Sequence, residues 1–210
     1  MIVAFSHLLL GFIVSFIGSI PPASINLLVI KIASTKGIKK ALAFAAGAVF
    51  VEFVYSFIAI LFSKYLLENQ SINQTIQLVA IPVFLLLGCL SLFKRSKPED
   101  VTEIEKGNEF VNGLFMGLIN PLQIPFWMGY SSYFISIGWL KEDFLLITIF
   151  VIGIVLGTFL LLFIFAFYSK KWFYENNKSN WNGNMINKII GWIFITLAIV
   201  QAGKIFFWGY

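Results

Sequence analysis

The chain has 210 residues, of which 59% are hydrophobic and only 12% are charged, and its net charge is +5. A soluble domain carries about 25% charged and 45–50% apolar residues, so this composition excludes an ordinary soluble globular protein. The single cysteine excludes an internal disulfide and a two-cysteine redox relay. The composition therefore predicts an all-α protein embedded in a lipid bilayer.

Six apolar segments are each long enough to cross the ~30 Å hydrocarbon core of a bilayer, which needs roughly 20 helical residues. They are predicted at residues 3–32, 41–63, 74–93, 110–138, 144–168 and 187–208. The head of the first segment, MIVAFSHLLL, has no Lys or Arg, so it lacks the positive region of a cleaved signal peptide and is predicted to be a mature span. Six spans leave no room for a separate soluble domain.

The first span is interrupted at GSIPPASIN, residues 18–26. Proline lacks the N–H that would bond the carbonyl four residues back, and its ring clashes there, so Pro22 frees the carbonyl of Gly18. Proline also suits the first position of a new helix, which predicts two half-helices, the second starting near Ala23. Irregular backbone at mid-membrane depth persists only inside protein or beside a water-filled cavity. The alternative is an ordinary proline kink.

The second span contains Glu52, whose neighbours in AAGAVFVEFVYSFIA are apolar for a turn on either side. A charge at the bilayer centre costs several kcal/mol, with estimates from about 2.5 upwards. Desolvation favours the neutral carboxyl, so Glu52 is predicted to exchange protons, to bind a substrate ammonium group, or to do both in turn. Tyr55 lies on the adjoining face and is predicted to assist. The alternative is a protonated glutamate that bonds to a neighbouring helix.

The only long polar segment, residues 94–109, mixes charges of both signs with Pro and Gly, which predicts a solvated cytoplasmic linker. It separates a first three-helix repeat, residues 1–93, from a second, residues 110–210, within one membrane domain. Because each repeat has an odd number of spans, the second is predicted to enter the membrane from the opposite side to the first.

The fourth span repeats the interruption at GLINPLQIP, residues 117–125. A shift of 99 residues aligns Gly18 and Pro22 with Gly117 and Pro121, and a shift of 106 residues aligns the second spans of the two halves. These matches predict an inverted 3+3 repeat of six transmembrane helices, in which the first and fourth helices are broken near mid-membrane.

The two breaks predict a site for a small anion, because a helix N-terminus presents unpaired N–H groups and about half a positive charge. The predicted substrate-binding residues around the breaks are Pro22, Ser24, Asn26, Asn120, Pro121 and Gln123. The alternative for each Ser or Asn is a hydrogen bond that joins two helices. In the repeat, Glu52 corresponds to Thr158, so the two halves of the site are not chemically equivalent.

Basic residues are distributed unevenly between the two sides of the predicted membrane. Twelve of the 15 Lys and Arg residues lie in the first, third and fifth connections, and only Lys64, Lys141 and Lys204 lie on the other side. Cytoplasmic connections carry an excess of Lys and Arg, so both termini are predicted to lie outside. The same distribution explains the net charge without a nucleic-acid partner.

The segments that carry these features resemble the lysine-exporter (LysE) family, which includes the homoserine and threonine efflux proteins. The resemblance covers nearly the whole chain and rests on the break after GFIVSFIGS and on the segments KGIKKALAFAAGAVFVE and NPLQIPFW. It implies six spans, a duplicated core and secondary export of amino acids or related metabolites. Pro22, Asn120 and Pro121 match the family's break positions, although Pro21 replaces the glycine that usually precedes Pro22.

The predicted function is proton-coupled export of an amino acid or a similar zwitterion across the bacterial cytoplasmic membrane, without a cofactor. The spans contain no nucleophile–base pair, carboxylate pair or metal-ligand cluster, so an enzyme is not predicted. One alternative is a divalent-cation exporter, which would need several oxygen ligands where the spans offer only the Glu52 carboxylate. Another is a membrane scaffold, which would need neither matched breaks nor a buried glutamate.

Overall fold

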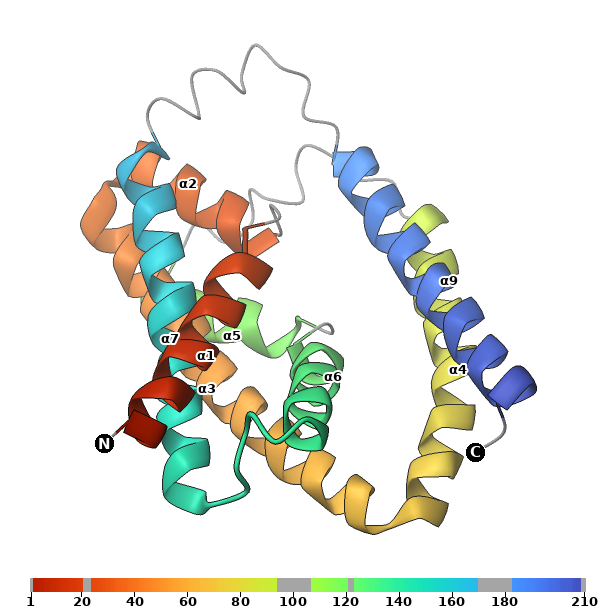
Figure 1. The fold of residues 1–210 in the computed structure, drawn as a ribbon. Helices are drawn as coiled ribbons and strands as arrows, with labels where there is room; N and C mark the ends of the chain where they lie inside the picture. The colour runs from red at the N-terminus through yellow and green to blue at the C-terminus, as the bar shows by residue number, and fades with distance from the viewer. Residues whose placement is uncertain (1, 21–23, 94–106, 121–122, 170–182, 209–210) are drawn as a thin grey trace. The chain divides into compact units, whose positions relative to one another are not determined.

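The computed structural model describes residues 2–20, 24–93, 107–120, 123–169 and 183–208. All the regular elements in these residues are helices, which confirms the predicted all-α class (Figure 1). In chain order they are α1 (Ile2–Gly18), α2 (Ser24–Lys36), α3 (Ile38–Glu68), α4 (Gln70–Phe93), α5 (Glu109–Leu118), α6 (Gln123–Ser136), α7 (Phe144–Phe167) and α9 (Gly183–Trp208).

Two helical segments, Ile38–Tyr65 within α3 and Phe144–Phe167 in α7, are long and apolar enough by themselves to cross a membrane. The predicted first and fourth spans are each divided into two helices, and none of these four helices exceeds 17 residues. A single helix needs roughly 20 residues to cross the hydrocarbon core, so each half of a broken span is too short to pass alone.

Both predicted interruptions coincide with gaps between helices. The second helix of each pair begins at Ser24 and at Gln123, each two residues after the proline to which the break was attributed. Those prolines, Pro22 and Pro121, lie outside the described residues.

The helices form two compact units. The first contains residues 1–65 and 104–178, and thus α1, α2, most of α3, α5, α6 and α7. The second contains residues 66–103 and 179–210, and thus α4 and α9. Each unit draws helices from both predicted three-helix repeats.

In the first unit, α1 lies against α7 at backbone contact (Figure 1). A Cβ atom on Gly11 would overlap the carbonyl oxygen of Phe150, and one on Gly153 would overlap the carbonyl oxygen of Leu8. Small residues of this kind let two helix backbones approach closely, which is how helices associate within lipid.

Helix α5 packs on α3 in the same way. A Cβ atom on Gly113 would overlap the carbonyl oxygen of Phe44, and one on Gly47 would overlap the carbonyl oxygen of Phe110. Both close contacts therefore join the first helix of one predicted repeat to the second span of the other repeat.

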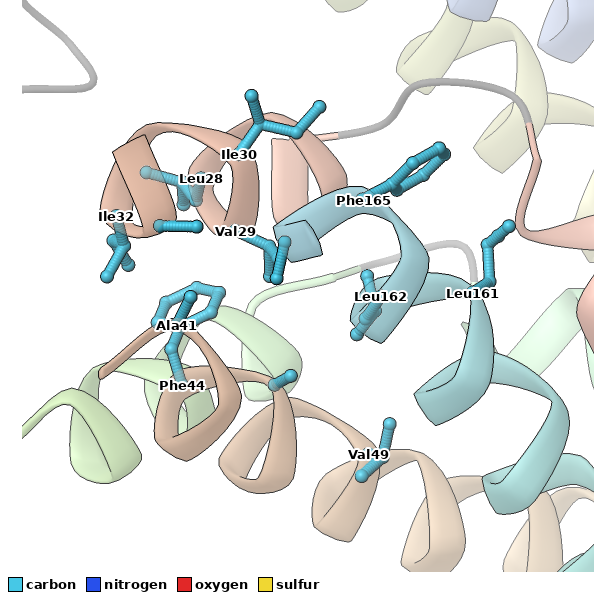
Figure 2. Packing of buried hydrophobic residues seen from close by; sticks show 13 residues of the cluster. Leu28, Val29, Ile30, Ile32, Ala41, Phe44, Val49, Leu161, Leu162 and Phe165 are labelled. Carbon is cyan, nitrogen blue, oxygen red and sulfur yellow. The ribbon is translucent and has the colours of Figure 1, made fainter. Parts of the chain in front are cut away.

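Two hydrophobic clusters fill the first unit. One joins α2, the N-terminal part of α3 and the C-terminal part of α7, and Figure 2 shows side chains of these three helices converging. The other joins the C-terminal part of α3, α6 and the N-terminal part of α7. Phe44 is fully buried in the first cluster and Phe150 in the second.

The second unit is a pair of helices, α4 and α9, that pack along each other. A Cβ atom on Gly88 would lie 3.1 Å from the carbonyl oxygen of Gly191, and one on Gly191 would lie 3.0 Å from that of Gly88. The rings of Phe84 and Phe194 add a contact with centroids 5.9 Å apart. Glycine contacts thus recur in both units.

Candidate functional site

The first break is held by hydrogen bonds within a short stretch of chain. Ser19 N–H donates to the Ser15 carbonyl at 2.9 Å, and Ile20 N–H donates to the Ile17 carbonyl at 3.2 Å. Asn26, buried near the start of α2, donates from Nδ2 to the Ser19 carbonyl at 2.8 Å. The Asn26 side chain therefore joins the end of α1 to the beginning of α2.

The second break has a matching bond at the end of its first helix. Asn120 N–H donates at 3.2 Å to the carbonyl of Gly117, three residues earlier, and Ile20 N–H at the first break likewise donates to the carbonyl of Ile17. The Tyr55 hydroxyl of α3 donates to the carbonyl of Leu118 at 3.1 Å. Tyr55 thus satisfies a carbonyl that the interrupted helix leaves without an intrahelical partner.

Glu52 lies in the interior of the first unit, with only 5% of its surface exposed. Its hydrogen-bonding neighbours are Thr158 of α7 and Trp127 of α6, and no charged side chain acts on it among the described residues. Its Oε2 atom is buried without a hydrogen-bond partner. A buried oxygen without a partner costs free energy unless a ligand or a proton occupies it.

Thr158 extends this polar region to α1. Its hydroxyl lies within hydrogen-bond distance of the Ser15 hydroxyl, and it lies 3.3 Å from the Ser19 hydroxyl. The polar cluster is defined as Ser15, Ser19, Glu52, Trp127 and Thr158. The cluster brings residues of α1, α3, α6 and α7 to the first break.

Aromatic side chains of α6 close the space beside the first break. The tip of the Phe126 ring lies so near Gly18 that a Cβ atom there would be 2.6 Å away. Trp127 is 1% exposed, and its ring meets that of Phe126 at 90° with centroids 4.9 Å apart. Because α6 begins just after the second break, this contact places the second half of the fourth span against the first break.

Gln123 is the first residue of α6 and supplies a second unsatisfied acceptor. Its Oε1 atom is buried without a hydrogen-bond partner, as is Oε2 of Glu52. These are the two buried side-chain atoms in the described residues that lack a partner. Both are acceptors, so a ligand that fits them must donate hydrogen bonds, as an ammonium or amide group does.

A pair of serines fixes α6 on α3 close to Trp127. The hydroxyls of Ser63 and Ser131 lie 2.9 Å apart, and both residues are buried. Ser131 also donates to the Trp127 carbonyl, one turn earlier in α6. These bonds hold the helix that positions the Trp127 indole beside Glu52.

Polar contacts also join the ends of the half-helices. Lys36 Nζ lies 3.0 Å from Glu109 Oε1, which joins the last turn of α2 to the first turn of α5. Lys141 N–H donates to His7 Nε2 at 3.0 Å, and His7 Nδ1 donates to the Val3 carbonyl at 2.7 Å. The second pair of bonds joins α1 to the segment before α7.

The predicted site residues differ in their surroundings. Glu52 and Asn26 lie at the first break, and Tyr55, Asn120 and Gln123 lie at the second. Ser24 is exposed at the start of α2. Pro22 and Pro121 lie outside the described residues.

Glu52 is the one member of the polar cluster among the predicted site residues; Ser15, Ser19, Trp127 and Thr158 are absent from that prediction. The sequence could have placed Thr158 in the site, because the predicted repeat aligns it with Glu52. For Ser15 the sequence offered only its position one turn before Ser19. That position does not place it in the site, because helix rotation decides which side of α1 faces the interior.

The described residues contain no group of three or more His, Cys, Asp or Glu side chains that could hold a metal ion. A divalent cation at this position would have Glu52 as its one charged ligand, whereas such ions take several oxygen ligands.

Comparison with protein families shows that the family described as LysE type translocator matches residues 16–203. The matched region includes both breaks and every member of the polar cluster except Ser15. Comparison with curated proteins and with solved structures gives no match.

Proposed function

Because the chain belongs to the LysE type translocator family and is therefore an integral membrane protein, we propose that it exports amino acids or related small zwitterionic metabolites. Export is coupled to protons, in the bacterial cytoplasmic membrane, with both termini outside. The observation that carries this proposal is the buried, unpartnered Oε2 of Glu52 between two interrupted helices.

In the proposed binding position, the two oppositely charged ends of the substrate contact different parts of the site. The carboxylate docks at the N-terminal ends of α2 and α6, where N–H groups and the helix dipole favour an anion. Pro22, Ser24, Asn26, Asn120, Pro121 and Gln123 are the proposed substrate-binding residues around these ends. The ammonium group donates to Glu52, whose carboxyl has an oxygen free to accept.

The proposed inverted repeat is supported by the register of helix packing. Gly11 contacts the Phe150 carbonyl, and Gly113 contacts the Phe44 carbonyl. An offset of 102 residues relates the two glycines, and the offset of 106 residues found in the sequence relates the two phenylalanines. Pro22 and Pro121 are related by 99 residues, which is fewer than the 102 residues that relate Gly11 to Gly113. The stretch of chain from the packing glycine to the break is therefore about one helical turn longer at the first break than at the second.

Proton exchange supplies enough free energy for uphill export. Moving one elementary charge through the membrane potential is worth about 2.3 kcal/mol per 100 mV. At 1.4 kcal/mol per factor of ten, this corresponds to a substrate gradient of roughly fifty-fold. Glu52 is the proposed proton carrier, since it is the buried carboxyl at the break.

The proposal is tested by the extracellular metabolite profile of cells that express the native protein, Glu52→Gln or Glu142→Gln and are loaded with mixed dipeptides. Glu142 is exposed, so its variant makes the same chemical change away from the site. We expect one or a few amino acids to accumulate outside with the native protein and with Glu142→Gln, and not with Glu52→Gln. Membrane abundance of each variant is measured in parallel.

The other outcomes separate the parts of the proposal. Equal export by Glu52→Gln and the native protein would leave transport standing and refute the role of Glu52. If no profile differed from that of empty cells, amino-acid export would be wrong, and resistance to divalent cations would be measured next.

A further inference from the structure

The hydroxyl of Thr158 stands between Glu52 and the first break. It lies within hydrogen-bond distance of Ser15 and 3.3 Å from the Ser19 hydroxyl, and it is a hydrogen-bonding neighbour of the Glu52 carboxyl. Ser15, Glu52 and Thr158 are each more than nine-tenths buried. In so closed a position these groups depend on one another for their hydrogen bonds.

The protonation state of Glu52 dictates the direction of these bonds. A hydroxyl has one proton to donate, and an ionised carboxylate can only accept. When Glu52 is ionised, Thr158 donates to it and accepts from Ser15 or Ser19. When Glu52 is protonated and donates to Thr158, the threonine proton turns towards Ser15 or Ser19. Each hydroxyl keeps its own proton and changes only its direction.

This reversal reaches the backbone of the break through Ser19. The carbonyl oxygen of Ser19 accepts the hydrogen bond from Asn26 that joins α1 to α2. A change in the hydrogen bond made by the Ser19 hydroxyl therefore acts on the residue at which the two half-helices are connected.

We propose that Thr158 is a positioning residue that transmits the proton state of Glu52 to the first break and so couples proton exchange to substrate movement. This inference rests on the proton-coupled export proposed above. The groups that face Glu52 from the packed helices are Thr158 of α7 and the Trp127 indole N–H of α6, and neither is charged at neutral pH. On α3 itself, the nearest titratable residue in the sequence is Tyr55, which donates to Leu118.

The repeat explains why a threonine occupies this position. Glu52 and Thr158 are related by the offset of 106 residues, so they are equivalent positions of the two repeats that meet at the polar cluster. A second carboxyl at position 158 would place two like charges in one buried site, which is strongly unfavourable. A hydroxyl can instead donate or accept according to the state of its partner.

The first test uses Thr158→Val, which keeps the shape of the side chain and removes its hydroxyl, and Thr158→Ser, which keeps the hydroxyl. Infrared difference spectra are recorded between acid and alkaline pH on purified protein in liposomes, and the carboxyl band of Glu52 is assigned by its loss in Glu52→Gln. We expect this band to move to higher frequency in Thr158→Val, because the carboxyl loses a hydrogen bond, and to stay near its native position in Thr158→Ser.

The second test measures transport of a mixture of radiolabelled amino acids by the same liposomes. Uphill movement driven by a pH gradient requires coupling, whereas exchange between equal internal and external pools does not. We expect Thr158→Val to lose about tenfold in uphill movement, the loss of one hydrogen bond to a charged group, while exchange changes by less than about twofold. Thr158→Ser should retain both activities.

Three results would overturn the inference: no band lost in Glu52→Gln, an unchanged Glu52 band in Thr158→Val, or equal loss of uphill movement and exchange in Thr158→Val. The last result would indicate a structural role only. If the native protein moved no amino acid, the proposed function would fail. The infrared comparison would still decide whether the Thr158 hydroxyl bonds to the Glu52 carboxyl.

Discussion

At the scale of single residues, the polar side chains near the breaks divide into two groups. Asn26 and Tyr55 have partners, because they bond to the backbone carbonyls of Ser19 and Leu118. Glu52 and Gln123 each keep a buried acceptor atom without a partner. The first group therefore supports the interrupted backbone, and the second also leaves buried acceptor atoms for a substrate or a proton.

Replacing Asn26 is expected to destabilise the protein. Asn26→Ala removes the donor to the part-buried Ser19 carbonyl, which costs about 1 kcal/mol in the free energy of unfolding. Ser24→Ala, two residues earlier on the exposed side of the same turn, should change it by less than about 0.5 kcal/mol. Thermal unfolding of the two purified variants in one detergent provides the comparison, and equal midpoints would refute the structural role of Asn26.

Replacing Gln123 is expected to act in the opposite direction on stability. Gln123→Leu removes a buried acceptor without a partner, so it should leave the free energy of unfolding unchanged or raise it by about 1 kcal/mol. The same change should raise the KM for transport about tenfold, since a substrate loses one hydrogen bond. A variant that is less stable than the native protein, with unchanged KM, would show that Gln123 has a structural role.

The sequence predicted the environment of Glu52 better than its partners. A long apolar run around one carboxyl predicts burial, and Glu52 is 5% exposed. The apolar run contains no information on which helix faces that carboxyl, because a rotation of α7 by one residue would replace Thr158 by a neighbour. Ser15 and Thr158 were missed for this reason.

At the scale of helices, glycine contacts set which elements lie together. The interruptions and most helix boundaries follow from prolines and apolar runs, which are local features. The pairing of α1 with α7 and of α5 with α3 depends on glycines far apart in the chain, such as Gly11 and Gly153. Sequence periodicity cannot identify such pairs, since many small residues on apolar helices are equally suitable.

Two glycine substitutions are expected to have opposite effects on stability. Gly153→Ala places a methyl group against the Leu8 carbonyl and should cost about 1–3 kcal/mol, because neither backbone can yield without separating the helices. Gly129→Ala meets open space within α6 and should gain up to about 1 kcal/mol from higher helix propensity. Thermal unfolding of the pair tests the contact. A stabilising Gly153→Ala would show that α1 and α7 are not in backbone contact.

At the scale of the whole molecule, the two predicted repeats are interwoven rather than placed next to each other in chain order. The first unit takes α1, α2 and α3 from one repeat and α5, α6 and α7 from the other. The closest backbone contacts within it join different repeats. Rocking of residues 1–93 against 110–210 would therefore have to separate both glycine contacts, which favours motions that keep α1 with α7 and α3 with α5.

The proposed orientation in the membrane is tested with single cysteines in a Cys89→Ser background. Lys39, at the start of α3, and Glu142, just before α7, are both exposed and are predicted to lie on opposite sides. With a membrane-impermeant thiol reagent, Glu142→Cys should be labelled in intact cells and Lys39→Cys only after the membrane is opened. The reverse result would place both termini in the cytoplasm. Because the proton and substrate gradients, and not the orientation of the carrier, set the direction of a coupled exchange, the proposed export would stand and only the assignment of the two faces of the protein to the two sides of the membrane would be reversed.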